Sequence, residues 1–151
     1  MSENSTPSTQ SSNASNDSWA FLGLRLFLAI RWFFAGLEKF GTPGNYSFEN
    51  YYAKMSGMAY GIAENSIMPG WATKVFALPL GYIMLLLSVT MLLGVKLRIS
   101  LIVSLLLYVG LSVGLMAVDE QHGIAWLGIH VIMSVMALKM VGSARWVVWK
   151  D

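Results

Sequence analysis

Four long apolar stretches dominate the 151-residue chain, and they cover residues 19–40, 75–94, 99–118 and 124–141. An α-helix rises roughly 1.5 Å per residue, so helices of these lengths are about 27–33 Å long and match the ~30 Å hydrocarbon core of a bilayer. A soluble protein can bury one such helix, but a chain this short has almost no other residues with which to bury four. The sequence therefore predicts an all-α membrane protein built as a four-transmembrane-helix bundle.

The scarcity of charge supports the same conclusion. Only 12% of the residues are charged, against about 25% in an ordinary soluble domain. A soluble enzyme and a disordered regulator are therefore both disfavoured. The ten Lys and Arg residues are scattered and form no basic run, so we expect no nucleic-acid partner. The absence of cysteine excludes disulfides, cysteine-ligated metals and thiol chemistry by this chain.

The two ends of the chain differ from the apolar part. Thirteen of the first eighteen residues are Ser, Thr, Asn or Gln, a composition that cannot bury enough apolar surface to offset the entropy of ordering. We expect residues 1–18 to form a disordered polar tail and residues 19–144 to form the membrane domain. Residues 145–151 combine Trp146 and Trp149 with flanking cations, which predicts an interfacial tail after the last span.

The connections predict how the spans are joined. Residues 94–98 and 119–123 are short links, so the second and third spans, and the third and fourth, form antiparallel hairpins. The connection over residues 41–74 is longer and opens with the turn signal Gly-Thr-Pro-Gly-Asn.

This long connection also has an amphipathic pattern. Phe48, Tyr52, Met55 and Ala59 share one helical face, which favours a short interfacial helix between spans one and two. An aromatic loop folded over the bundle fits the pattern about as well. Either element caps one end of the protein.

Charge predicts the orientation. With four spans, the two termini share one side with the 94–98 link, and that side carries Lys96, Arg98, Arg145 and Lys150 near the ends of the spans. On the other side, cations and carboxylates are balanced in the long connection, and the 119–123 link carries only acidic charges. The positive-inside rule then predicts that both termini are cytoplasmic.

Two features within the spans bear on packing. Gly110 and Gly114 form a small-xxx-small face, which fits either packing within the chain or dimerisation, and we favour the former. We expect Pro79 to lie in the first turn of the second span, where its missing N–H costs little.

The first span carries an unusual number of charges, namely Arg25, Arg31, Glu38 and Lys39. A charged side chain at the centre of a bilayer costs about 2.5–3.5 kcal/mol on insertion scales. Arg31 and Glu38 are seven positions apart and share a helical face, so we expect them to face the bundle interior, toward the fourth span. Arg25 and Lys39 lie nearer the ends of the span and have the alternative of reaching the headgroups.

His130 is the second candidate, because it lies near the middle of the fourth span and shares a face with Trp126. It has two plausible roles. It either makes a hydrogen bond to a serine or a backbone carbonyl on a neighbouring helix, or it serves a quinone or another small ligand as a hydrogen-bond or proton partner.

The stretch from Arg25 to Lys39 resembles the first span of the DoxX-like family of four-helix membrane proteins, in which an arginine is followed by a glycine and then a lysine. Arg25, Gly36 and Lys39 occupy those places. The sequence from Leu93 to Arg98 is similar to the family's Gly-then-Arg link, and the likeness covers about residues 19–142. The chain departs from the family by having Ala35 at a position that is often polar, and no acidic residue in the second span.

The resemblance implies a bacterial or archaeal inner-membrane protein and links it to quinone, since the family includes a membrane subunit of thiosulfate:quinone oxidoreductase. Our first hypothesis is an integral membrane subunit of an oxidoreductase system, with no covalently bound cofactor and with partner membrane or redox subunits. The candidate ligand-facing residues are Arg25, Arg31, Glu38, Lys39, Trp126 and His130. The alternatives are a non-catalytic accessory subunit of a larger membrane complex and, third, a small-solute transporter or channel.

Overall fold

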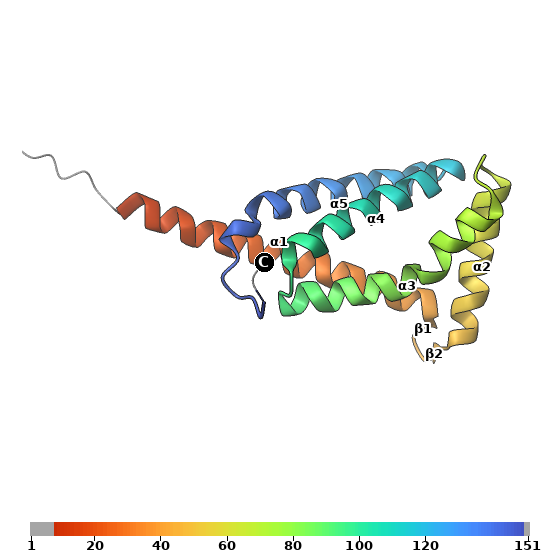
Figure 1. Ribbon diagram of the computed structural model, residues 1–151, viewed down its shortest axis with the longest axis horizontal. Coiled ribbons are helices and arrows are strands. Elements are labelled where there is room, and N and C mark those ends of the chain that lie inside the picture. Colours follow the sequence, from red (N-terminus) through yellow and green to blue (C-terminus); the bar gives the residue numbers. More distant parts are fainter. Residues whose placement is uncertain (1–7, 150–151) are drawn as a thin grey trace, which may run out of the picture.

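The computed structural model describes residues 8–149, and the side chains from residue 16 onward. Within this part of the chain the fold is all-α apart from one two-stranded ribbon (Figure 1). The elements in chain order are α1 (Ser8–Phe40), β1 (Gly41–Thr42), β2 (Asn45–Tyr46), α2 (Phe48–Glu64), α3 (Gly70–Leu93), α4 (Leu97–Ala117), α5 (Gln121–Met140) and the short 3-10 helix η1 (Val141–Ser143).

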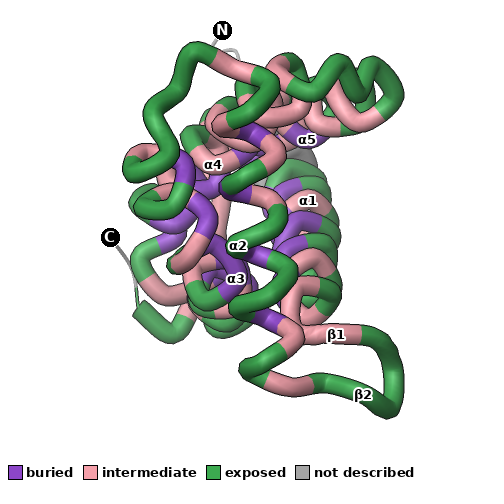
Figure 2. Tube along the Cα trace, turned by 90° about the vertical axis from the view of Figure 1, so that its right-hand side faces the viewer, coloured by how far each residue is buried: buried purple, intermediate pink, exposed green. Residues whose placement is uncertain are grey.

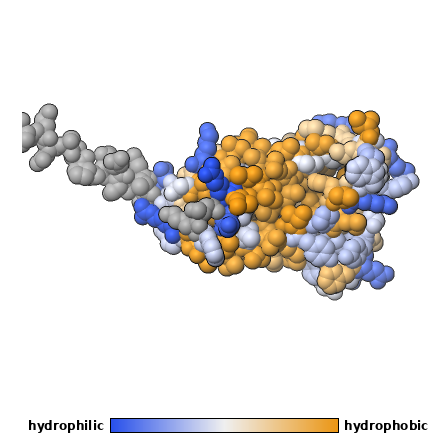
Figure 3. Space-filling model, viewed as in Figure 1, coloured by the Kyte–Doolittle hydropathy of each residue, from blue (hydrophilic) through white to orange (hydrophobic). Residues whose placement is uncertain are grey.

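Four helical segments are long and apolar enough to cross a membrane, as the sequence predicts. They are Asn16–Phe40, Gly70–Leu93, Leu97–Ala117 and Gln121–Ser143. Apolar side chains form a wide belt around the middle of the molecule, and hydrophilic residues gather at its two ends (Figure 3). This distribution is that of a bundle whose sides face lipid and whose ends face water.

The four long helices pack as two pairs. α1 lies against α3, α4 lies against α5, and α2 crosses the end of the bundle, where it packs mainly on α3 (Figure 1). Buried positions gather where the helices face one another, and the β1–β2 ribbon projects beyond them (Figure 2). The core includes Leu28, Trp32, Leu80, Met91 and Leu101, none of which is more than 1% exposed.

The small-residue face of α4 packs within the chain. A side chain at Gly110 would meet the Phe76 ring at 3.2 Å, and one at Gly114 would meet the Ile62 side chain at 3.4 Å. α3 and α2 therefore approach this face closely, as we expected of intramolecular packing.

α1 begins earlier than predicted. It is helical from Ser8, whereas we expected a disordered tail over residues 1–18, and Ser18 is buried. Adding residues to an existing helix is far less costly than starting one, so the apolar span can extend its helix into polar sequence. Residues 1–7 of the predicted tail lie outside the described residues.

The long connection contains both a turn and a helix. Gly41 pairs with Tyr46 and Thr42 with Asn45, so Pro43 and Gly44 form the two-residue turn that the sequence predicts. Gly44 has φ 87°, a value that favours glycine. The Ser47 hydroxyl then caps α2 by accepting a hydrogen bond from the Asn50 N–H at 3.0 Å.

The buried face of α2 differs from the predicted one. Met55 and Ala59 of the predicted face are buried against the bundle, and they are joined there by Tyr51 and Ile62. Phe48 and Tyr52, which we placed on the same face, are 65% and 51% exposed. The helix turns its inner face to the bundle and leaves a row of aromatic side chains outside.

Pro79 does not lie in a first turn, so that expectation was wrong. α3 begins at Gly70, after Pro69, and Pro79 is inside the helix. A proline there removes one ladder hydrogen bond and bends the helix, and α3 is visibly bent (Figure 1). The hydroxyl of Tyr51 is inserted at the bend, where it donates to the Leu78 carbonyl and accepts from the Gly81 N–H at 3.2 Å. α2 is thereby fastened to α3.

We predict that Gly81→Ala destabilises the protein. A Cβ at this position would lie 2.5 Å from a ring carbon of Tyr51, and overpacking of this kind costs about 1–3 kcal/mol. Thermal unfolding in mild detergent measures the loss. Gly128→Ala on α5 is the control, because nothing lies within 4 Å of its Cβ position, and it should unfold at or above the wild-type temperature. Equal unfolding temperatures of the two variants would show that α2 is not tightly packed on α3.

Candidate functional site: a cavity at one end of the bundle

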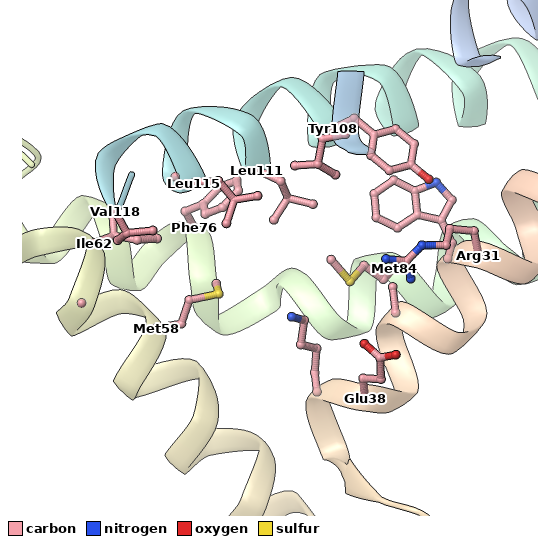
Figure 4. A pocket seen from close by; sticks show the side chains of 16 residues that line it. Arg31, Glu38, Met58, Ile62, Phe76, Met84, Tyr108, Leu111, Leu115 and Val118 are labelled. Carbon is pink, nitrogen blue, oxygen red and sulfur yellow. The ribbon is translucent and has the colours of Figure 1, made fainter. Parts of the chain in front are cut away.

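A cavity of about 340 Å³ lies at the end of the bundle that α2 covers (Figure 4). All five helices contribute to its walls. It is lined by Arg31, Trp32, Ala35, Glu38, Lys39, Met58, Gly61, Ile62, Phe76, Met84, Tyr108, Leu111, Gly114, Leu115, Val118 and Leu127.

The charged groups of the cavity all come from α1. Arg31, Glu38 and Lys39 line one wall, and side chains from the other four helices make the remaining walls apolar or aromatic. The spacing explains this grouping, because residues seven or eight apart return to the same face of a helix. Arg31 and Glu38 thus share a face that lines the cavity. Both residues are nevertheless exposed, so they do not occupy the bundle interior that the sequence predicts.

The charges within this wall are separated. Arg31 and Glu38 are about 10 Å apart along the helix axis, and no ion pair joins them among the described residues. Lys54 of α2 donates to the Glu38 backbone carbonyl at 2.7 Å, so a further cation lies beside this wall. Three cations and one carboxylate therefore surround the α1 side of the cavity, and its local charge is positive.

An aromatic pair closes the inner end of the cavity. The rings of Trp32 and Tyr108 stack with their centroids 4.2 Å apart. The indole N–H of Trp32 donates to the Ser104 hydroxyl at 2.7 Å, which fixes the orientation of the ring. Both rings are almost completely buried, so they close the inner end of the cavity and expose little surface there.

His130 and Trp126 do not line the cavity. His130 lies behind the aromatic pair, 5.1 Å from Tyr108 and 6.1 Å from Phe27 between ring centroids. Its Nδ1 is 2.7 Å from the Trp126 carbonyl oxygen, a carbonyl of its own helix rather than of a neighbour. The Trp126 side chain is 55% exposed, and its indole N–H donates to His122 at 3.0 Å.

Arg25 lies at the opposite end of the bundle from α2. It is only 5% exposed, and it donates to the Trp146 backbone carbonyl. The segment after η1 is held there by two further bonds, from Val148 N to Leu93 O at 3.2 Å and from Trp149 N to Gly94 O at 3.3 Å. The four charged candidates of α1 are thus divided, with three at the cavity and Arg25 anchoring the C-terminal segment.

Sequence reasoning missed three important residues: Trp32, Tyr108 and Tyr51. The first two looked like ordinary apolar core, and only their mutual stacking makes them the end of a cavity. Tyr51 carried one available signal, since a tyrosine on a capping helix needs a partner for its hydroxyl when it is buried. The partner atoms belong to the backbone of α3 and cannot be found in the pattern of side chains.

Comparison of the chain with protein-family models, with curated proteins and with solved structures finds no match. The site is therefore interpreted from its own geometry.

We predict that Tyr51→Phe loosens the cover of the cavity. Both backbone groups would lose a hydrogen-bond partner, at a cost of about 1–3 kcal/mol. Burial raises the pKa of Tyr51, so the unfolded chain releases this proton first. Stability from Tyr51 is present below pH ~10 and falls as the pH rises above that value. The stability difference between wild type and Tyr51→Phe should accordingly shrink above pH ~10.

Thermal unfolding at pH 8 and pH 10.5 measures both effects. Tyr52→Phe is the matched control, because Tyr52 is 51% exposed, and it should change little at either pH. A Tyr51→Phe protein as stable as this control would contradict the role assigned to the hydroxyl.

Proposed function

We propose that the protein is a membrane subunit of an oxidoreductase system that binds a quinone in the cavity. The observation that carries the proposal is the combination of an apolar cavity, inside a bundle of membrane-spanning length, with one cationic wall. A quinone has a flat ring with two carbonyl acceptors and an apolar tail, so it needs surfaces of both kinds. The resemblance of residues 25–39 to the DoxX-like family supports the same ligand.

Each part of the ligand has a suitable partner. The guanidinium of Arg31 and the ammonium of Lys39 are donors only, which suits carbonyl oxygens. The Trp32–Tyr108 pair closes the inner end of the cavity, and the apolar walls from α2, α4 and α5 suit the ring and its hydrocarbon tail. A volume of about 340 Å³ lies within the usual range for small-molecule sites.

The redox step itself needs a second protein. Reduction of a quinone consumes two electrons and two protons, and the chain has no cysteine to supply electrons. We therefore propose a reduced partner subunit as the electron donor. The role of this chain is to bind and orient the quinone beside that partner.

Binding of a radiolabelled short-chain benzoquinone to the purified protein tests this function. Leu111→Trp places a larger side chain in the cavity and should abolish saturable binding. Leu106→Trp lies on the same helix but is 64% exposed, and it should bind as wild type does. Equal binding by both variants, or no saturable binding by wild type, would overturn the proposal.

The alternative is a non-catalytic accessory subunit of a larger membrane complex. The broad apolar sides of the bundle (Figure 3) could equally pack against other membrane subunits. Purification in mild detergent distinguishes the two, because an accessory subunit would co-purify with a complex and without quinone.

We further propose that the protein lies in the cytoplasmic membrane of a bacterium or archaeon with both termini inside and α2 at the outer interface. The bias of Lys96, Arg98 and Arg145 toward one end supports this orientation. Exposed aromatic rings support the placement of α2, since Tyr60 and Trp71 are 65% and 72% exposed and such rings favour the interface.

The absence of native cysteine makes this topology directly testable. Asn45→Cys should react with a membrane-impermeant maleimide in intact cells, because Asn45 lies in the exposed ribbon. Lys96→Cys, in the link between α3 and α4, should react only after the cells are opened. The reverse pattern would invert the orientation.

A further inference from the structure

Among the described residues, five polar side-chain atoms are buried without a hydrogen-bond partner in the protein. One is the Nε of Arg25, at the opposite end of the bundle from α2, and the other four lie in the bundle interior. They are the hydroxyl oxygens of Ser88, Tyr108 and Ser134 and the Nε2 atom of His130. None of these residues is more than 7% exposed. Buried polar groups are almost always paired with protein or with ordered water, so a group of this size points to internal water.

Tyr108, His130 and Ser134 belong to the paired helices α4 and α5, whereas Ser88 is on α3. The rings of Tyr108 and His130 are neighbours across the antiparallel pair α4 and α5. Ser104 lies one turn before Tyr108, and Ser134 lies one turn after His130, so the two serines lie at the same level of the antiparallel pair. Ser104 is already bonded to Trp32, whereas the Ser134 hydroxyl has no hydrogen-bond partner in the protein.

The hydrogen bond at Nδ1 determines which ring nitrogen of His130 carries the proton. A carbonyl oxygen can only accept, so the contact with the Trp126 carbonyl requires the proton to be on Nδ1. In the neutral ring Nε2 is then a free acceptor. Nε2 can take a proton, which makes the ring an imidazolium, and can release the same proton without any change of the Nδ1 bond.

The surroundings of His130 leave few other groups to bind this proton. α1 presents Phe27 to the ring, and α4 presents Tyr108. Tyr108 is the one titratable neighbour among these contacts. The nearby charge is that of Arg31, which is close enough to act electrostatically on the Tyr108 hydroxyl. Tyr108 and Arg31 both line the cavity, so this region borders the cavity directly.

We propose that His130, Tyr108 and Ser134 form a hydrated proton-exchange site that opens to the cavity past Tyr108. Water bridges the two hydroxyls to Nε2, and His130 takes up and releases protons through that water. The site would store protons for a ligand that is reduced in the cavity, and this use rests on the proposed quinone function. Its existence does not depend on that function.

Nitrogen NMR of the histidines tests the site without any quinone. The chain has two histidines, so His122→Gln leaves His130 as the single signal in protein labelled with ¹⁵N-histidine and reconstituted in lipid. At neutral pH we expect a protonated Nδ1, an unprotonated Nε2, and magnetisation transfer from water to the ring.

Two further variants make the test specific. In the His122→Gln background, Ser134→Ala should weaken the transfer from water and shift the Nε2 resonance, and Tyr108→Phe should do so more strongly. Ser112→Ala is the control, because its hydroxyl is already satisfied by the Tyr108 carbonyl at 2.8 Å, and it should leave the signal unchanged. The proposal is overturned if Nε2 shows no contact with water, or if Ser134→Ala and the control Ser112→Ala behave alike. Neither result bears on the binding of quinone, which is measured separately.

Discussion

The structure depends on the need to place the polar groups of α1 away from lipid. Between Leu22 and Phe40, α1 carries four charged residues and the indole N–H of Trp32, and hydrocarbon offers none of them a partner. The solution differs along the helix. At one end Arg25 is buried under the C-terminal segment, in the middle Trp32 is bonded to Ser104, and at the other end Arg31, Glu38 and Lys39 face a cavity. The remaining helices are arranged around these three requirements.

The cavity exists because α2 holds the end of the bundle in a particular shape. α1 pairs with α3 and α4 pairs with α5, so a bundle of four helices alone would be free to close at this end. α2 lies across it and is fastened by the Tyr51 hydroxyl to the backbone of α3 near Pro79. The proline disrupts the regular ladder, and the tyrosine supplies polar partners at the bend. A local irregularity in one helix thereby becomes the attachment point of another.

The polar interior extends beyond the cavity. Behind the stacked rings of Trp32 and Tyr108, buried hydroxyls and His130 continue along the facing sides of α4 and α5. The hydroxyl groups are uncharged, so their burial costs far less than that of ions. The cavity and the buried polar groups of α4 and α5 are thus adjacent, because Tyr108 borders both.

The sequence by itself determined the elements that follow from periodicity and length. It predicted four spans and both short links, because apolar runs of bilayer length leave no other economical fold for so short a chain. It also predicted the turn after the first span, the shared face of Arg31 and Glu38, and an element that caps one end of the bundle. Each of these depends on residues that are close together along the chain.

Tertiary structure decided which of those residues meet. The bonds of Arg25 to Trp146 and of Trp32 to Ser104 join residues that are far apart in the sequence, and no local pattern specifies such partners. Helices propagate into residues that hydropathy alone would leave outside the spans. For this reason α1 begins at Ser8, and Pro79 lies inside α3. The grouping of Arg31 with Tyr108 around one cavity, and the separation of His130 from it, follow from how helices pack. Packing is set by the shapes of facing side chains, and a single sequence contains no record of which faces come together.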